Sequence, residues 1–232
     1  MPKTEDAYNA LRSAILECTL PPDAPLTVSL LKERFGFGWT PLREALSRLE
    51  AERLVVLAPN RGYRVCGVSA ESLRDLQDAR LAIEPRLFIR SIAEGGEEWE
   101  GRVVAAHHQL ASTPVPVPHA ARDAIHLWER RHDAFHAALL SGTQAPWLQL
   151  FASQVNDQLR RHQRHMLSSP EVRARMDDDP QGRLRETYEK TLGLGPHTEL
   201  MQAALDRDAD RASGLLTDHI GFSLAVFEAL WS

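Results

Sequence analysis

The chain has 232 residues, of which 43% are hydrophobic and 25% are charged, and its formal net charge is −5. These proportions are ordinary for a soluble globular protein, and the negative charge argues against a protein that simply coats nucleic acid. No apolar run approaches the roughly 20 residues that span a bilayer, and the polar N-terminus lacks the apolar core of a signal peptide. The two cysteines, Cys18 and Cys66, form no CxxC pair. We therefore expect a cytoplasmic protein without a disulfide framework or a thiolate metal site.

Charge and histidine are distributed unevenly along the chain. Residues 1–69 carry nine basic and eight acidic side chains, whereas the remainder carries 18 basic and 24 acidic side chains. All ten histidines lie between His107 and His219. This segregation suggests that the two ends of the chain have different functions.

The N-terminal third predicts three helices. Apolar residues recur at helical spacing in 6–19 and in 26–35, and the glycines of Gly36-Phe37-Gly38 end the second segment. A third helix is expected to start at Thr40, which is a good N-cap, with Pro41 in the first helical position. Its predicted buried face consists of Leu42, Ala45, Leu46 and Leu49.

A β-hairpin pattern follows the third helix. The apolar run 54–57 is separated by the turn residues 59–62 from the alternating segment 63–68. Three helices followed by a two-stranded ribbon are the elements of a winged helix-turn-helix, whose second motif helix enters the major groove of DNA. We therefore predict a DNA-binding domain over residues 1–69. The periodicity alone also permits a small helical cap domain with solvated arginines.

The sequence of this segment resembles the DNA-binding domain of the gluconate-repressor (GntR) superfamily. The resemblance rests on LPP before the second helix, FG at its end, TPLREALSRLEAE on the third helix and RGYRV in the wing. It implies DNA contacts from Thr40 and Arg43 at the start of the third helix, and from Arg61 and Gly62 in the wing. Arginine suits a guanine edge or a phosphate because its planar fork binds bidentately.

The chain departs from the GntR pattern at several positions. Gly38-Trp39 replaces the usual Ser/Thr-Arg, and Ser29-Leu30 replaces the Glu-Arg that the family often has early in the second helix. Two customary arginines are therefore absent. Trp39 is expected either to contact DNA or to belong to the core. Arg53 and Asp23 stand where the family usually has glycine. The operator sequence is therefore not expected to follow the family's usual one.

Residues 70–232 predict an all-α antiparallel bundle of six or seven helices, because no strand pattern occurs after Val68. The proline-rich segment 113–119 is expected to be a connector, and 168–182 an exposed loop. The run RRHQRH at 160–165 is expected to form a solvated or effector-facing basic surface. The helices are expected at about 70–94, 97–111, 121–140, 146–166, 197–205 and 209–230.

Four of the histidines form a candidate metal site. His132 and His136 are four residues apart, so they share one face of a helix, and His197 and His219 lie on the last two helices. Imidazole suits Zn, Ni, Cu or Fe, and an open zinc site needs three protein ligands. For each histidine taken singly, ordinary surface or core hydrogen bonding is the alternative.

Three stretches, DARLAIEP, WERRHDAFHAALL and PHTELMQAALDRDADRASGLLTDHI, resemble the FCD effector domain of the FadR branch of the same superfamily. Many FCD domains hold a metal with an Asp, a His four residues later and two distal His. Here His136, His197 and His219 match, while His132 stands at the Asp position with Asp133 beside it. The resemblance thus implies a divalent transition metal, Zn or Ni, with His132 or Asp133 as the fourth ligand.

The resemblance also implies that Arg80 faces the cavity, where it would hold a small organic acid. An ion pair between Arg80 and Glu84, four residues later, is the alternative. We therefore expect a homodimeric repressor that binds a double-stranded DNA operator and does not associate with a membrane. The sequence leaves activation open as the alternative to repression. The other functions considered are a ligand-binding module with weakened DNA binding and a metal-dependent enzyme. The sequence does not support an enzymatic function, because no glutamate of the HExxH type accompanies the histidine pair.

Overall fold

The computed structural model describes residues 3–58, 62–116, 121–168 and 192–231, with a few single residues between 168 and 192. The chain divides into two compact units. The N-terminal unit comprises residues 1–73 and 156–166, and the helical unit comprises residues 74–155 and 167–232. The domain boundary after residue 69 stays a prediction. Arg61, most of the 168–182 loop and residues 117–119 of the connector lie outside the described residues.

The N-terminal unit contains a winged helix-turn-helix, as predicted. Its helices are α1 (Lys3–Leu16), α2 (Val28–Phe35) and α3 (Trp39–Ala51), and its wing pairs β2 (Val55–Ala58) with β3 (Gly62–Val65). A third strand, β1 (Pro25–Leu26), pairs antiparallel with the other edge of β3. The sequence did not predict β1, because two residues are too few to display an alternating pattern.

The third helix begins two residues earlier than expected. Gly38 is its N-cap, so Trp39 is the first helical residue and Thr40 the second. The predicted N-cap role of Thr40 is therefore wrong. Pro41 remains compatible with this start, because the first N–H groups of a helix have no intrahelical partner to lose. The predicted buried face is confirmed: it consists of Leu42, Ala45, Leu46 and Leu49, all 0% exposed.

Five described residues of this unit have left-handed backbone geometry, and they are Cys18, Asp23, Gly36, Arg53 and Gly62. Asp23 has φ 63°, Arg53 has φ 56° and Gly62 has φ 73°. Asp23 and Arg53 are the two positions where the family usually has glycine, so the fold retains the geometry without the residue that adopts it at no cost. At Gly62 the same geometry starts strand β3 directly after the wing turn.

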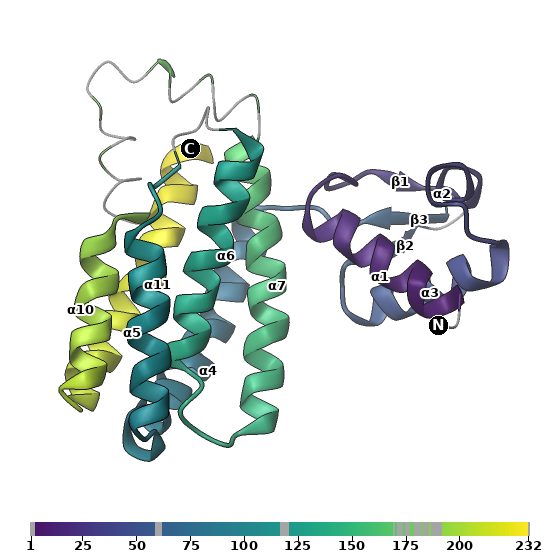
Figure 1. Cartoon of the computed structure of the whole chain (residues 1–232). Coiled ribbons are helices and arrows are strands. Elements are labelled where there is room, and N and C mark those ends of the chain that lie inside the picture. Colours follow the sequence, from purple (N-terminus) through teal and green to yellow (C-terminus); the bar gives the residue numbers. More distant parts are fainter. Residues whose placement is uncertain are drawn as a thin grey trace. The chain divides into compact units, whose positions relative to one another are not determined.

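The described part of the helical unit consists of long helices without a strand (Figure 1). Helix α5 packs against both α6 and α10, and α10 packs against α11. The all-α bundle is therefore confirmed. Among the described helices, none combines the length and the apolar character needed to cross a membrane. The helices of this unit are α4 (Ala70–Glu94), α5 (Glu97–Ala111), α6 (Arg122–Leu139), α7 (Pro146–Ser168), α10 (Leu194–Leu205) and α11 (Ala209–Trp231).

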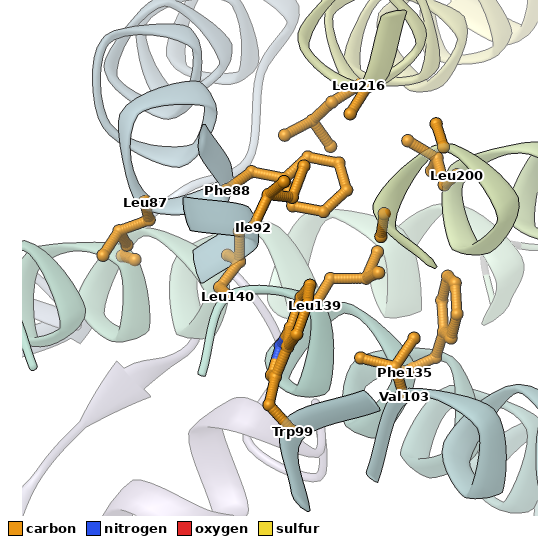
Figure 2. Packing of buried hydrophobic residues seen from close by; sticks show 14 of the residues in the cluster. Leu87, Phe88, Ile92, Trp99, Val103, Phe135, Leu139, Leu140, Leu200 and Leu216 are labelled. Atoms are coloured by element: carbon orange, nitrogen blue, oxygen red, sulfur yellow. The ribbon is translucent and has the colours of Figure 1, made fainter. Parts of the chain in front are cut away.

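Large apolar side chains from several helices meet in the core of the bundle (Figure 2). Phe88 of α4, Trp99 of α5 and Phe135 of α6 are at most 1% exposed. The indole N–H of Trp99 donates a hydrogen bond to the carbonyl of Ala138 at 2.9 Å. Because the only polar group of this side chain is satisfied, it can be buried without an unpaired donor. The core thus fixes the position of α6 in the bundle.

Candidate metal centre and DNA-binding surface

Three helices bring the four predicted histidines together inside the bundle. His132 and His136 come from α6, His197 from α10 and His219 from α11, and each is at most 8% exposed. One ligand nitrogen from each histidine lies within 4.8 Å of those of the other three. In tetrahedral zinc sites, ligand nitrogens are about 3.3 Å apart, so small side-chain rotations would bring the set to bonding geometry. The four residues that sequence spacing singled out are therefore one cluster.

Three histidines of the cluster have a buried ring nitrogen without a hydrogen-bond partner in the described structure. These atoms are Nε2 of His136, Nε2 of His197 and Nδ1 of His219. The other nitrogen of His197, Nδ1, lies 2.7 Å from the carbonyl oxygen of Gly193 and donates to it, which leaves Nε2 as an acceptor. An unpaired buried nitrogen is costly, whereas a metal ion satisfies it. The residues present therefore fit a transition metal.

Burial keeps these imidazoles neutral, which is the form that binds a metal. Burial lowers the pKa of His197 to about 3, with a further contribution from His132. The pKa values of His136 and His219 also lie well below 6.5, chiefly because of burial and then because of the neighbouring histidines. At neutral pH, His136, His197 and His219 therefore offer lone pairs instead of positive charges.

The cluster contains His132 and does not include Asp133. The His132 ring stacks on Trp128, with 4.6 Å between the ring centroids, and its Nδ1 lies 3.7 Å from Oδ1 of Asp133. Asp133 is one residue further along α6, so its side chain projects about 100° away from that of His132 around the helix. This arrangement favours His132 over Asp133 as the fourth ligand.

Arg80 lies beside this cluster and is engaged in an ion pair. Its Nε is 2.9 Å from Oε1 of Glu84, and both residues are at most 6% exposed. The positive charge of Arg80 also contributes to the lowered pKa values of His136 and His219. The ion-pair alternative raised by the sequence is therefore present, and the guanidinium still acts on the histidine cluster.

Sequence reasoning missed further buried polar residues of these helices, among them an amide on α4 and an acid on α6. Gln77 of α4 and Glu129 of α6 are each 3% exposed. Gln77 shares a helix face with Arg80, three residues later, and Glu129 shares a face with His132 by the same spacing. The signal was available, because a polar residue in register with a proposed site residue faces the same interior. Among the described residues, the interior of the helical unit thus includes Glu84, Glu129, Arg80 and Gln77 besides the four histidines.

Two residues of the RRHQRH run are buried, so the solvated alternative is wrong for them. Arg161 is 1% exposed and His162 is 3% exposed. Nε2 of His162 lies 2.8 Å from the Ser72 hydroxyl, and Nδ1 lies 2.9 Å from the Gln158 carbonyl oxygen. Burial lowers the pKa of His162 to about 4.

Acid is therefore expected to destabilise the protein partly through His162. Between pH 6.5 and about 4 the unfolded chain protonates this imidazole and the folded chain does not, so the free energy of unfolding falls as pH falls. One such group contributes on the order of 1 kcal/mol per pH unit. Urea unfolding with EDTA present should give a shallower pH dependence for His162→Gln than for the wild type. If the free energy of unfolding depends on pH in the same way for both proteins, His162 is not a source of the acid destabilisation.

The predicted DNA-contacting residues of α3 lie on its exposed first turns. Trp39, Thr40 and Arg43 are all exposed, so the core alternative for Trp39 is wrong. The guanidinium carbon of Arg43 lies 6.0 Å from the centroid of the Trp39 ring. Gly62 is exposed at the start of β3. This surface combines a planar cation with an apolar ring at the N-terminus of the helix that would enter the groove.

Models of known protein families match both the N-terminal and the C-terminal part of the chain. The model of bacterial regulatory proteins of the gntR family matches residues 3–65, and the FCD domain model matches residues 75–222. The HTH-type transcriptional repressor GlaR of Escherichia coli (strain K12) is 34% identical over 215 residues, covering 93% of this chain and 91% of the repressor. The HTH-type transcriptional regulator BphR of Paraburkholderia xenovorans (strain LB400) is 34% identical over 225 residues, covering 96% and 84%.

Solved structures show the same fold at lower sequence identity. A GntR transcriptional regulator from Rhodococcus sp. RHA1 has a TM-score of 0.68 and 22% identity, with 99% of each chain covered. Escherichia coli McbR/YncC has a TM-score of 0.69 and 18% identity over 100% of both chains. GlaR and BphR are named as transcriptional regulators and not as enzymes. The chain therefore belongs to the gntR family of bacterial transcriptional regulators and carries an FCD domain.

Proposed function

We propose that this regulator represses transcription from the cytoplasm, and that a small carboxylate effector bound beside a metal ion in the helical unit controls its affinity for the operator. The observation that carries the proposal is the buried cluster of His132, His136, His197 and His219, with ligand atoms within 4.8 Å of one another. A packed interior has no reason to collect unpaired imidazole nitrogens at one point unless a ligand satisfies them.

The donor set favours a nitrogen-preferring metal, Zn or Ni. Four imidazole ligands supply no negative charge, whereas an aspartate at the position of His132 would supply one. Oxygen-preferring ions such as Mg²⁺ and Mn²⁺ are therefore disfavoured, and zinc and nickel are favoured. The bound ion would retain its full double positive charge, which attracts an anion.

A carboxylate is the group that this environment selects. The metal would offer a coordination position, and Arg80 would offer a fork of N–H donors. Since Arg80 is paired with Glu84 at 2.9 Å, an incoming carboxylate must share or replace that partner. An exchange of partners at Arg80 provides a way for the effector to prefer one arrangement of α4 over another.

The operator side of the proposal requires two copies of the chain. Dimers with a helix-turn-helix bind two half-sites about one helical turn apart, so one recognition helix enters each half-site. The relative GlaR is a repressor, which supports repression as the outcome of binding. In each copy, the DNA would be contacted by Thr40 and Arg43 of α3 and by Arg61 and Gly62 of the wing. Trp39 would lie at the same surface.

Substituting Arg43, the exposed arginine near the start of α3, tests this assignment. Arg43→Ala is expected to weaken binding to DNA selected by the wild type by about 10- to 100-fold, because one bidentate arginine contact contributes that much discrimination. Fluorescence anisotropy at fixed salt measures the change. The matched control is Arg102→Ala, which removes an exposed arginine from α5 of the helical unit. Equal affinities for Arg43→Ala and the control would contradict the DNA-binding surface.

A module that binds ligands but no longer binds DNA is the second candidate function. The observation that favours it is Gly38-Trp39, which stands where the GntR pattern has an arginine. In that case the wild type would enrich no sequence from a random DNA pool, while metal binding would remain intact.

A further inference from the structure

Trp39 is a large aromatic residue that the fold leaves in solvent. Its side chain is 58% exposed, and the buried face of α3 is made without it, by Leu42, Ala45, Leu46 and Leu49. Single exposed apolar residues are common on proteins and need no explanation by themselves. This one is the first residue of the helix that the fold presents to DNA.

The neighbours of Trp39 hold it at this surface without covering it. Arg43, one helical turn later, places its guanidinium carbon 6.0 Å from the ring centroid, at the outer limit of a cation–π contact. Gly38 before it has no side chain and is itself exposed. The first turns of α3 therefore present an indole ring and a guanidinium side by side.

The chemistry of the major groove decides what such a pair recognises. The N-terminal residues of a recognition helix contact base edges there. Guanine offers two acceptors that fit an arginine fork, and the C5 methyl of thymine is the one apolar group that the bases display in that groove. An indole ring lacks a positive charge, so it adds nothing to the attraction between protein and phosphates.

We propose that Trp39 is a specificity-determining residue whose ring packs against the C5 methyl of a thymine in the major groove. Each half-site then contains an A·T pair where the first turn of α3 meets the bases, at a position where an arginine would select guanine. Arg43, held against the ring, contacts the adjacent base or phosphate. The inference rests on the proposed function, because it requires α3 to enter the major groove.

Uracil in place of thymine tests the contact at a single methyl group. The wild-type chain is first used to enrich a consensus from a random duplex pool. Each thymine of that consensus is then replaced in turn by deoxyuridine, which keeps every hydrogen-bonding group and removes only the methyl. Binding of each duplex is measured for the wild type, Trp39→Ala, Trp39→Phe and Trp147→Ala. The last variant is the control, because Trp147 is 71% exposed in the helical unit.

We expect one thymine per half-site at which deoxyuridine weakens wild-type binding by about fourfold, the effect of burying one methyl-sized group. Trp39→Ala should lose this sensitivity, and Trp39→Phe should retain part of it. Trp147→Ala should behave as the wild type does in this respect. The slope of log affinity against log salt should be the same for the wild type and Trp39→Ala, because no phosphate contact is removed.

Three results would overturn the inference, and they differ in whether they also overturn the proposed function. If the wild type enriches a clear consensus but no deoxyuridine weakens its binding, or if Trp39→Ala keeps the full sensitivity, the inference fails and the proposed function stands. If the wild type enriches no sequence, the proposed function fails and the inference fails with it. Thermal unfolding of Trp39→Ala checks that the substitution of this exposed residue leaves the fold intact.

Discussion

Replacing His136 and His219 together by alanine is expected to abolish metal binding and the thermal stabilisation that the metal provides. In the wild type, an ion present at a thousandfold excess over its dissociation constant would stabilise the folded state by about 4 kcal/mol. For a chain of this size that corresponds to a rise in Tm of roughly 8–16 °C. The doubly substituted chain keeps only His132 and His197, which are too few for a closed or an open zinc site.

The Tm of each protein is compared with and without metal. Any direct effect of the two substitutions on stability is the same in both conditions and therefore cancels. Elemental analysis should find about one Zn or Ni ion per wild-type chain. The matched control is His107→Ala/His108→Ala, which removes two histidines of α5 outside the cluster and should leave metal content unchanged. A folded wild type that retains no metal after incubation with Zn and Ni and desalting would contradict the site.

The second large effect is expected from Gly142→Ala, which should destabilise the protein by about 3 kcal/mol. A Cβ at this position would lie 2.5 Å from the carbonyl oxygen and 2.9 Å from the Cα of Ser91, both backbone atoms that cannot rotate away. The Gly142 N–H also donates a hydrogen bond to the Ser91 hydroxyl at 3.1 Å. This close contact ties the end of α6, which carries His132 and His136, to α4. We therefore expect Gly142→Ala to bind metal more weakly as well.

Gly214→Ala is the matched substitution with the opposite expected sign. Gly214 lies within α11, and a Cβ there would meet no atom within 4 Å. Alanine in an exposed helix interior is favoured over glycine by about 1 kcal/mol, so the variant should be more stable than the wild type. Urea unfolding of both variants measures the two changes. If Gly142→Ala is as stable as the wild type, the prediction is wrong, because α4 and the end of α6 then move apart without a loss of stability.

Much of the fold could be predicted because its signals are local. Helices α4 and α5 begin and end at the expected residues, since Gly95-Gly96 separates two long amphipathic segments. The winged helix-turn-helix was predictable from three helical periods and one hairpin. Strand β1 was not, because its pairing with β3 joins residues about 40 positions apart and leaves no periodic pattern. The start of α3 was misplaced because Thr40 and Gly38 are both acceptable N-caps.

The candidate site was also predictable only where its sequence signals are local. The i, i+4 spacing of His132 and His136 puts them on one face, but only the packing of α10 and α11 brings His197 and His219 to that face. The burial of Arg161 and His162 had no local signal, because an Arg- and His-rich run on an amphipathic helix has the composition of a solvated surface. Their burial is decided by residues distant in sequence, such as Ser72 and Cys66, which contact them.

The coupling between the two units is the central claim, and one titration tests it. Operator affinity of the metal-loaded wild type and of His136→Ala/His219→Ala is measured against a panel of small mono-, di- and hydroxycarboxylic acids. We expect at least one acid to change the dissociation constant of the wild type by about 5- to 150-fold, the usual range of allosteric coupling. The doubly substituted chain should bind the operator without acid and show no response to it. An equal response in both proteins, or none in a wild type that binds both metal and operator, would contradict the account.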